Sequence, residues 1–308
     1  MPMSLPIGKL GKLDKLDKLG KLCKMSKLNG FKWTRTDIYM KILFTDLDGT
    51  LLNNDSRVSA GTKAFLDEFL SAGNKLVLSS GRPRDSVIEV KNDAGLTQSG
   101  ILLSCSNGAL VFDCDREASI MERTLPLSYV SHLQGEADAL GLHIQTYTRD
   151  SIMCREEDEE IRFYRRRIHL PLVLAEDYAS SLTAEPHKML AIDLHDREKL
   201  LTYCDRIADW SEGKIRYIFS NDWYLELFVK EAGKGNAVRF VCEYFGVPLS
   251  DAYAAGDAEN DISMIEAAGC GIAMANAAPN VKEAADIVTR LGNDKDGLAE
   301  CMKELLSD

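Results

Sequence analysis

The fold of this 308-residue chain is decided by residues 40–50, MKILFTDLDGT. A short apolar run, residues 42–44, is followed almost at once by Asp46, Asp48 and Gly49. Such a run, ending in a polar turn, is typical of a buried strand in a parallel sheet. Ligands of open α/β sheets bind beyond the carboxyl ends of the strands. The stretch therefore predicts both a first core strand and a reactive site at its end.

Strand-like and helix-like segments alternate after this stretch. Ser59 is a suitable N-cap for a helix that Gly73 would close, and Asn107-Gly108 is a turn pair that could open a hairpin. The expected strands lie at residues 75–78, 101–104, 110–112 and 120–122, and later at 224–229, 252–255, 271–274 and 287–289. This order predicts an α/β fold with a parallel sheet and helices on its faces.

Residues 124–222 differ in pattern from the segments on either side, because they combine predicted amphipathic helices and strands with dense charge. We interpret them as an inserted second domain, with residues 40–123 and 223–308 forming the first. The acidic run 156–160 and the basic run 165–167 are predicted to be solvated faces, since charge runs usually are. The aromatic side chains of Trp223, Tyr224 and Phe228 are predicted to pack in the core.

Residues 1–39 form a low-complexity segment in which Lys recurs at every third position from Lys9 to Lys27. A three-residue period drifts around a helix of 3.6 residues per turn, so its leucines form no apolar stripe. The segment resembles neither a secretory signal nor a transit peptide. We interpret it as a disordered basic tail that a start at Met40 would remove.

The composition of the chain argues against several classes of function. The net charge is −11, which argues against a nucleic-acid partner, and no apolar window is long enough to predict a membrane span. The eight cysteines show no C-x-x-C pair and are predicted to be reduced thiols of a cytoplasmic protein. The five histidines show no spacing typical of a zinc site.

Two aspartates follow the first strand. Asp46 and Asp48 are two residues apart, so both carboxylates can face one small volume while Gly49 permits a tight turn. Such a pair suits covalent phosphoryl transfer: one carboxylate attacks phosphorus, and the other protonates the leaving oxygen and later activates water.

A second acidic cluster, GDAENDI at residues 256–262, follows another expected strand. Asp257 and Asp261 can converge on one ion. Carboxylates and a phosphate dianion repel one another by about 4 kcal/mol per charge pair at about 4 Å and an effective dielectric of about 20, so a cation is needed. Oxygen ligands and a phosphate substrate favour Mg²⁺.

Two further segments complete the expected site. Residues 79–82, SSGR, follow the second strand and could hold phosphate oxygens with a hydroxyl and backbone N–H groups. Lys234 lies between Gly233 and Gly235 at the start of a helix and offers a charge to offset the aspartates.

The four clusters, D-L-D-G-T, S-S-G-R, G-K-G and G-D-A-E-N-D, in this order resemble the haloacid-dehalogenase superfamily, specifically the Cof-type phosphatases with a large α/β (C2B-type) cap. The resemblance covers residues 40–308. It implies a Rossmann-like core and an inserted α+β cap that sets substrate specificity. The substrate would be a small phosphorylated metabolite, with sugar phosphates foremost.

The resemblance also implies roles for individual residues. Asp46 would be the nucleophile, Asp48 the general acid and base, and Lys234 the charge-balancing lysine. Mg²⁺ would be held by the Asp46 carboxylate, the Asp48 backbone carbonyl and Asp257, with Asp261 in its support. The expected phosphate and substrate contacts are Ser80, Gly81, Arg82, Asn107 and Asn260.

Several alternatives remain open at this level. Ser79 competes with Ser80 as the phosphate-binding hydroxyl, Arg82 could bind substrate or brace its loop, and Asn107 could be a turn residue or a substrate contact. A phosphomutase or phosphotransferase would use the same clusters. A non-catalytic metabolite sensor on this fold would have no use for the nucleophile Asp46.

We predict that removing residues 1–39 changes neither folding nor turnover, because the tail can form no apolar face and the first core strand follows Met40. Circular dichroism and phosphate release of the truncated and full chains would check this. An insoluble or much slower truncated protein would contradict it.

Overall fold

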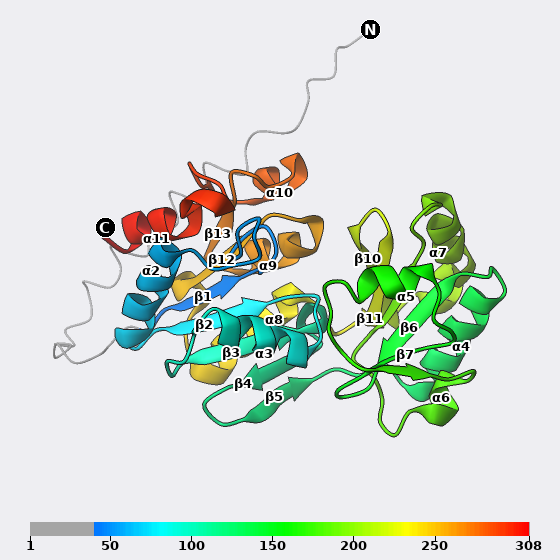
Figure 1. Cartoon of the computed structure of the whole chain (residues 1–308). Helices are drawn as coiled ribbons and strands as arrows, with labels where there is room; N and C mark the ends of the chain where they lie inside the picture. Colours follow the sequence, from blue (N-terminus) through cyan, green and yellow to red (C-terminus); the bar gives the residue numbers. More distant parts are fainter. Residues whose placement is uncertain (1–39, 308) are drawn as a thin grey trace, which may run out of the picture. The chain divides into compact units, whose positions relative to one another are not determined.

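The computed structural model describes residues 40–307. Their first sheet has eight strands in the order β14-β13-β12-β1-β2-β3-β4-β5 (Figure 1). The six strands from β14 to β3 are parallel, and β4 and β5 extend the sheet as an antiparallel hairpin. The strands are β1 (Ile42–Thr45), β2 (Lys75–Ser79), β3 (Ile101–Cys105), β4 (Leu110–Asp113), β5 (Ala118–Glu122), β12 (Ala252–Gly256), β13 (Cys270–Ala273) and β14 (Ile287–Val288).

Six helices accompany the parallel strands of this sheet in the described part of the chain. They are α2 (Ala60–Ser71), α3 (Arg84–Asp93), α8 (Lys234–Phe245), α9 (Ile262–Ala267), α10 (Pro279–Ala284) and α11 (Gly297–Ser307). The expected caps of α2 are present: the Ser59 side chain accepts from the Thr62 N–H at its start, and Gly73, with a φ of 85°, directly follows the C-cap residue Ala72 at its end. The predicted α/β alternation and the predicted hairpin are confirmed.

Both faces of this sheet are buried. Ile42 and Phe44 pack in one apolar cluster and Leu43, between them, packs in another. Side chains alternate between the faces of a strand, so an unbroken apolar run fills both layers. Strand β1 thus lies inside the fold, and its end is fixed on both sides by β12 and β2.

A second sheet has six strands in the order β10-β11-β9-β6-β7-β8. They are β6 (His143–Tyr147), β7 (Ile152–Cys154), β8 (Leu172–Leu174), β9 (Met189–Ile192), β10 (Ile215–Asn221) and β11 (Tyr224–Val229). The helices of this part are α4 (Leu127–Asp138), α5 (Glu159–Tyr164), α6 (Tyr178–Ser181) and α7 (Arg197–Ser211). Side chains of α4 and α7 share an apolar cluster with β6, β9 and β11.

The expected place of residues 224–229 is wrong. This segment is β11, which pairs with β10 and β9 in the second sheet and not with the first. The boundary expected at residue 223 therefore divides a β-hairpin, β10–β11, whose second strand carries the chain back to the first sheet. Its apolar pattern, YLELFV, fits a buried strand of either sheet, and only the pairing decides between them.

Three further observations bear on the expectations from composition. Among the described residues, no helix is long and apolar enough to cross a membrane. The seven cysteines of this part of the chain are all free thiols. The predicted tail lies outside the described residues.

Candidate active site

The predicted clusters lie at one edge of the first sheet. Asp46 follows the last residue of β1, and its backbone N–H donates to the carbonyl of Ala255 in β12 at 3.0 Å. Ser80 follows β2, and Asp257 follows β12. Because these strands are parallel neighbours, their carboxyl ends bring the three residues to one side of the sheet.

The turn after Asp46 brings the first cluster, residues 46–50, into contact with the acidic cluster at residues 256–261. Gly49 has a φ of 85°, and a Cβ atom there would lie 2.4 Å from Oδ2 of Asp257. The next hydroxyl, Thr50 Oγ1, donates to Oδ1 of Asp257 at 2.6 Å. Gly49 is thus needed both for its backbone conformation and for the close approach of Asp257.

Lys234 is the buried cation of the site. It is the first residue of α8, and its ammonium donates to Oδ1 of Asp46 and Oδ1 of Asp261, both at 2.6 Å. Its side chain is fully buried. Burial by itself would lower the pKa of Lys234, but the carboxylates of Asp261 and Asp46 outweigh it and raise that pKa. Lys234 is therefore charged.

Three carboxylates share this one ammonium. Oxygens of Asp46, Asp257 and Asp261 lie within 4.8 Å of one another. Burial and the neighbouring Asp261 raise the pKa of Asp46, and burial raises the pKa of Asp257 to about 6. Each carboxyl is held near negative charge that the protein alone does not neutralise. The all-oxygen donor set and the excess negative charge fit a hard divalent cation.

Asp261 also has a structural function in this cluster. Its Oδ2 accepts the backbone N–H groups of Asp257 and Ala258, both at 3.0 Å, while its Oδ1 accepts from Lys234. Both oxygens are thus engaged by the protein, and the residue is completely buried. This arrangement places Asp261 as a support of Lys234 and the Asp257 loop.

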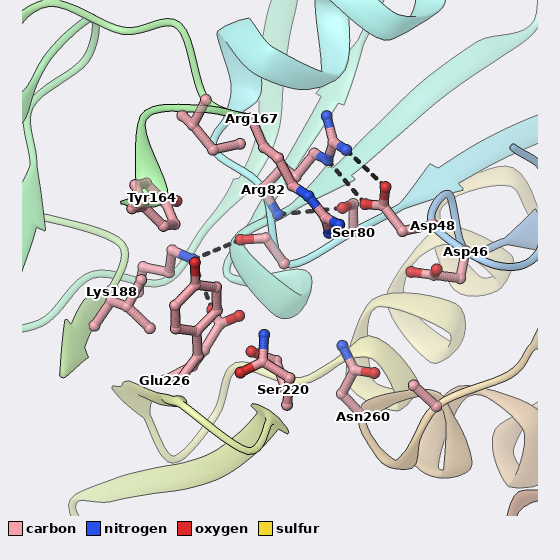
Figure 2. Close-up of a pocket in the computed structure, with 16 residues that line it drawn as sticks. Asp46, Asp48, Ser80, Arg82, Tyr164, Arg167, Lys188, Ser220, Glu226 and Asn260 are labelled. Atoms are coloured by element: carbon pink, nitrogen blue, oxygen red, sulfur yellow. Dashed lines mark hydrogen bonds and ion pairs between the residues drawn. The ribbon is translucent and has the colours of Figure 1, made fainter. Parts of the chain in front are cut away.

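The Asp48 side chain points toward Arg82 and away from Asp46 (Figure 2). The guanidinium of Arg82 donates to both Asp48 oxygens, at 2.9 and 2.7 Å. Arg82 in turn donates its backbone N–H to Ser80 Oγ at 3.2 Å. Ser80 and Gly81 line the pocket beside Asp46, whereas Ser79 does not. The geometry thus favours Ser80 over Ser79 as the hydroxyl that can reach a ligand.

Asn107 lies in the left-handed conformation, with a φ of 55°. Its Nδ2 donates to Oε2 of Glu226 at 3.0 Å, and its Oδ1 accepts from Asn260 Nδ2 at 3.2 Å. The next residue, Gly108, approaches so closely that a Cβ atom would lie 2.4 Å from the carbonyl oxygen of Gly233. Asn107 is a turn residue that joins the turn after β3 to strand β11 and to the loop after β12, and Asn260 reaches the pocket itself.

The pocket has a volume of about 180 Å³, and much of its wall comes from the second sheet and its connections. Asp46, Asp48, Ser80, Gly81, Arg82 and Asn260 form one side, and the other side consists of Tyr164, Arg167, Ile168, Lys188, Leu190, Ser220, Asn221, Tyr224 and Glu226. No sequence motif marks this second side. Tyr224 packs against an apolar cluster as expected but also lines the pocket. Two expectations are corrected: Trp223 is 43% exposed and does not pack in the core, and Arg167, from the basic run, lines the pocket.

The second side is tied to the first by a buried ion pair. Lys188 donates to Oε2 of Glu226 at 2.6 Å and to the carbonyl oxygen of Gly81 at 2.6 Å. The side chains of Lys188 and Glu226 are 2% and 7% exposed. One signal was available in the sequence: Glu226 is the charged residue in the otherwise apolar strand YLELFV, and a buried charge needs a partner.

Comparison with known proteins agrees with this fold. Residues 43–302 match the family of haloacid dehalogenase-like hydrolases. The chain is 30% identical to a putative phosphatase, YxeH, of Bacillus subtilis over 86% of this chain and 98% of that protein. It is 26% identical to 5-amino-6-(5-phospho-D-ribitylamino)uracil phosphatase YwtE of Bacillus subtilis over 87% and 99%. A crystal structure of a haloacid dehalogenase-like hydrolase from Bacteroides thetaiotaomicron superposes with a TM-score of 0.79, at 30% identity over 86% and 99% of the two chains.

The parallel sheet, with acidic residues at the ends of two adjacent strands beside a buried lysine, and the family match together identify the protein as a hydrolase with an α/β fold. The chain belongs to the haloacid dehalogenase-like hydrolases. The expected superfamily, fold class and enzyme class, a phosphatase, are confirmed.

We predict that Lys234→Met lowers the free energy of unfolding by about 3–5 kcal/mol in chelator at neutral pH, because it leaves the buried Asp46 and Asp261 carboxylates without their partner. Denaturant unfolding followed by circular dichroism would measure this. The control is Lys63→Met, which removes a partly exposed ion pair with Asp67 and should cost about 0.3–0.5 kcal/mol. Equal losses in the two variants would contradict the prediction.

Proposed function

We propose that this protein is a magnesium-dependent phosphatase that hydrolyses a small phosphorylated metabolite, foremost a sugar phosphate, through an aspartyl-phosphate on Asp46. The observation that carries the proposal is the position of the Asp46 carboxylate. It lines the pocket, 7% exposed, and is held by a buried ammonium at 2.6 Å. One of its oxygens is thereby oriented by the protein, and the carboxylate still faces the ligand space.

Asp46 would act as the nucleophile. Lys234 stabilises its ionised form and restricts its orientation, which prepares a carboxylate oxygen for attack on phosphorus without a separate base. The bond from Asp46 to phosphorus would form as the ester P–O bond breaks. Lys234 would then also offset the negative charge that gathers on the phosphoryl oxygens.

Asp48 would move the proton. In the protonated form it would give its proton to the departing ester oxygen, and as a carboxylate it would take one from the water that attacks the aspartyl-phosphate and releases inorganic phosphate. Its carboxyl has to leave Arg82 to do so. The donors of Arg82 would then be free for phosphoryl oxygens, and Ser80 and Gly81 could bind the same group.

The cation would be Mg²⁺, held by the carboxylates of Asp46 and Asp257 and the backbone carbonyl of Asp48, with Asp261 in support. When bound, Mg²⁺ would neutralise negative charge on the phosphate and carboxylate oxygens. The raised pKa of Asp257, about 6, supports this assignment, because burial is the main cause of the shift and a bound cation would stabilise the buried carboxylate.

The second sheet and its connections would act as a cap that determines which ester is accepted. Nine pocket residues come from it, but none of the proposed nucleophile, acid and metal ligands does. The name of YwtE describes a phosphate on a ribityl chain, which supports a hydroxylated substrate of similar kind for this protein. Free thiols throughout the described residues agree with a reducing, cytoplasmic location.

The metal assignment predicts that chelator abolishes phosphate release and that added Mg²⁺ restores it. Asp257→Asn should raise the Mg²⁺ concentration needed for half-maximal activity, because it removes a charged ligand. A release assay over a range of Mg²⁺ concentrations would check both points, with Asp209→Asn, an exposed aspartate, as control. Full activity in chelator would refute the metal requirement.

The nucleophile assignment predicts that Asp46→Asn has background turnover only, while Asp48→Asn retains a trace, since loss of a general acid typically costs about 10²–10⁴-fold. Borohydride reduction of enzyme quenched during turnover should convert residue 46 to homoserine, which peptide mass spectrometry would detect. Phosphate release without an added acceptor separates hydrolysis from phosphate transfer. Substantial turnover by Asp46→Asn would mean that water attacks directly.

A further inference from the structure

Tyr164 lies on the cap side of the pocket, away from Asp46. It is the last residue of α5, is 7% exposed and lines the pocket. Figure 2 shows it beside Lys188, on the opposite side of the pocket from Asp46 and Asn260. A ligand whose phosphate meets Asp46 would therefore bring its leaving group, and not its phosphoryl oxygens, toward Tyr164.

A chain of hydrogen bonds fixes the direction in which the Tyr164 hydroxyl donates. Gln145 Nε2 donates to the Tyr147 hydroxyl at 2.7 Å, and the Tyr147 hydroxyl donates to that of Tyr164 at 2.8 Å. An amide nitrogen can only donate, so the Tyr147 hydrogen is left for Tyr164. The Tyr164 hydroxyl therefore accepts a hydrogen bond from Tyr147, and its own hydrogen has no acceptor among residues 40–307.

The start of this hydrogen-bonded chain is tied to the first turn of α5. His143 Nε2 lies 3.2 Å from Gln145 Oε1, and Nε2 of the same amide lies 2.7 Å from the Tyr147 hydroxyl. His143 Nδ1 lies 2.6 Å from Oδ2 of Asp158. The other oxygen of Asp158 caps α5 by accepting the Ile161 N–H at 3.0 Å. The same carboxylate thus holds the helix that bears Tyr164 and the chain that orients its hydroxyl.

A buried hydroxyl hydrogen without an acceptor is unfavourable. The neighbouring ion pair does not bind this hydrogen: the Lys188 ammonium can only donate, and Oε2 of Glu226 already accepts from Lys188 and Asn107. Tyr164 is thus a donor prepared for an oxygen that the protein does not supply.

We propose that Tyr164 is a specificity-determining residue whose hydroxyl donates a hydrogen bond to an oxygen on the leaving group of the substrate. The inference rests on the proposed phosphatase function. It selects phosphate esters whose leaving group carries an oxygen acceptor away from phosphorus and discriminates against alkyl esters of the same length, because an alkyl group would leave the donor unpaired. Gln145 and Tyr147 are positioning residues in this scheme.

The test compares sorbitol 6-phosphate with n-hexyl phosphate, which share a six-carbon chain but differ in hydroxyl groups. The wild-type chain should have the higher kcat/KM for the sorbitol ester. Tyr164→Phe should lower the ratio of the two kcat/KM values by about two- to twelve-fold, the factor that one neutral hydrogen bond represents. Tyr147→Phe should lower it by a smaller factor, through loss of orientation alone.

The matched control is Tyr203→Phe, which removes another buried hydroxyl of the cap, one that donates to the Leu133 carbonyl at 2.9 Å outside the pocket. It should leave the ratio unchanged at a similar cost in stability. Equal kcat/KM values of the wild-type chain for the two esters would overturn the inference. So would a Tyr164→Phe variant whose kcat/KM falls equally for both esters or for neither. Failure to hydrolyse either ester, or turnover that survives Asp46→Asn, would instead overturn the proposed phosphatase mechanism.

Discussion

The site depends on one buried ammonium. Lys234 joins Asp46, at the end of β1, to Asp261, which in turn binds the loop that follows β12. Desolvation of these groups is expensive, and it is tolerated because each charge has close, well-directed partners. The consequence is that Asp46, the proposed nucleophile, is coupled to the Asp257 loop and to the start of α8. The Asp46 carboxylate is held in place by buried charges, each of which would be unfavourable without its partners.

The same constraint explains the two glycines that the loops require. Gly49 lets the first turn lie against Asp257, and Gly108 lets the turn after β3 lie against Gly233, immediately before Lys234. Any side chain at these positions would push an acidic loop or the lysine out of reach. Backbone contacts of this kind leave no charge pattern, yet they set the distances on which the electrostatic balance depends.

The sequence was sufficient where local pattern and chemistry coincide. The apolar strand and the D-x-D turn at residues 42–49 predict a sheet and a site together, and the acidic loop and the lysine at 234 lie where they were expected. The sequence was insufficient where pairing between distant strands decides which sheet a strand joins. The segment 224–229 has the pattern of a buried strand in either sheet, and its partner β10 assigns it to the second. Tyr164, Lys188 and Arg167 belong to no motif, because their function in the pocket follows only from the way the cap folds onto the first sheet.

The two sides of the pocket are polar in different ways, and this difference matters for function. On the first side the charges are fixed in number and geometry by the chemistry of phosphoryl transfer, which is the same for every ester. On the second side the ion pair of Lys188 and Glu226 is satisfied within the protein, and it joins the cap to Gly81 and Asn107 beside the reactive groups. A satisfied pair gives a ligand little net charge to recognise. Discrimination between substrates on that side therefore has to come from groups with unused hydrogen-bonding capacity. The Tyr164 hydroxyl is such a group, because Tyr147 orients it from within the cap. It can discriminate between substrates without disturbing the charges on the first side of the pocket.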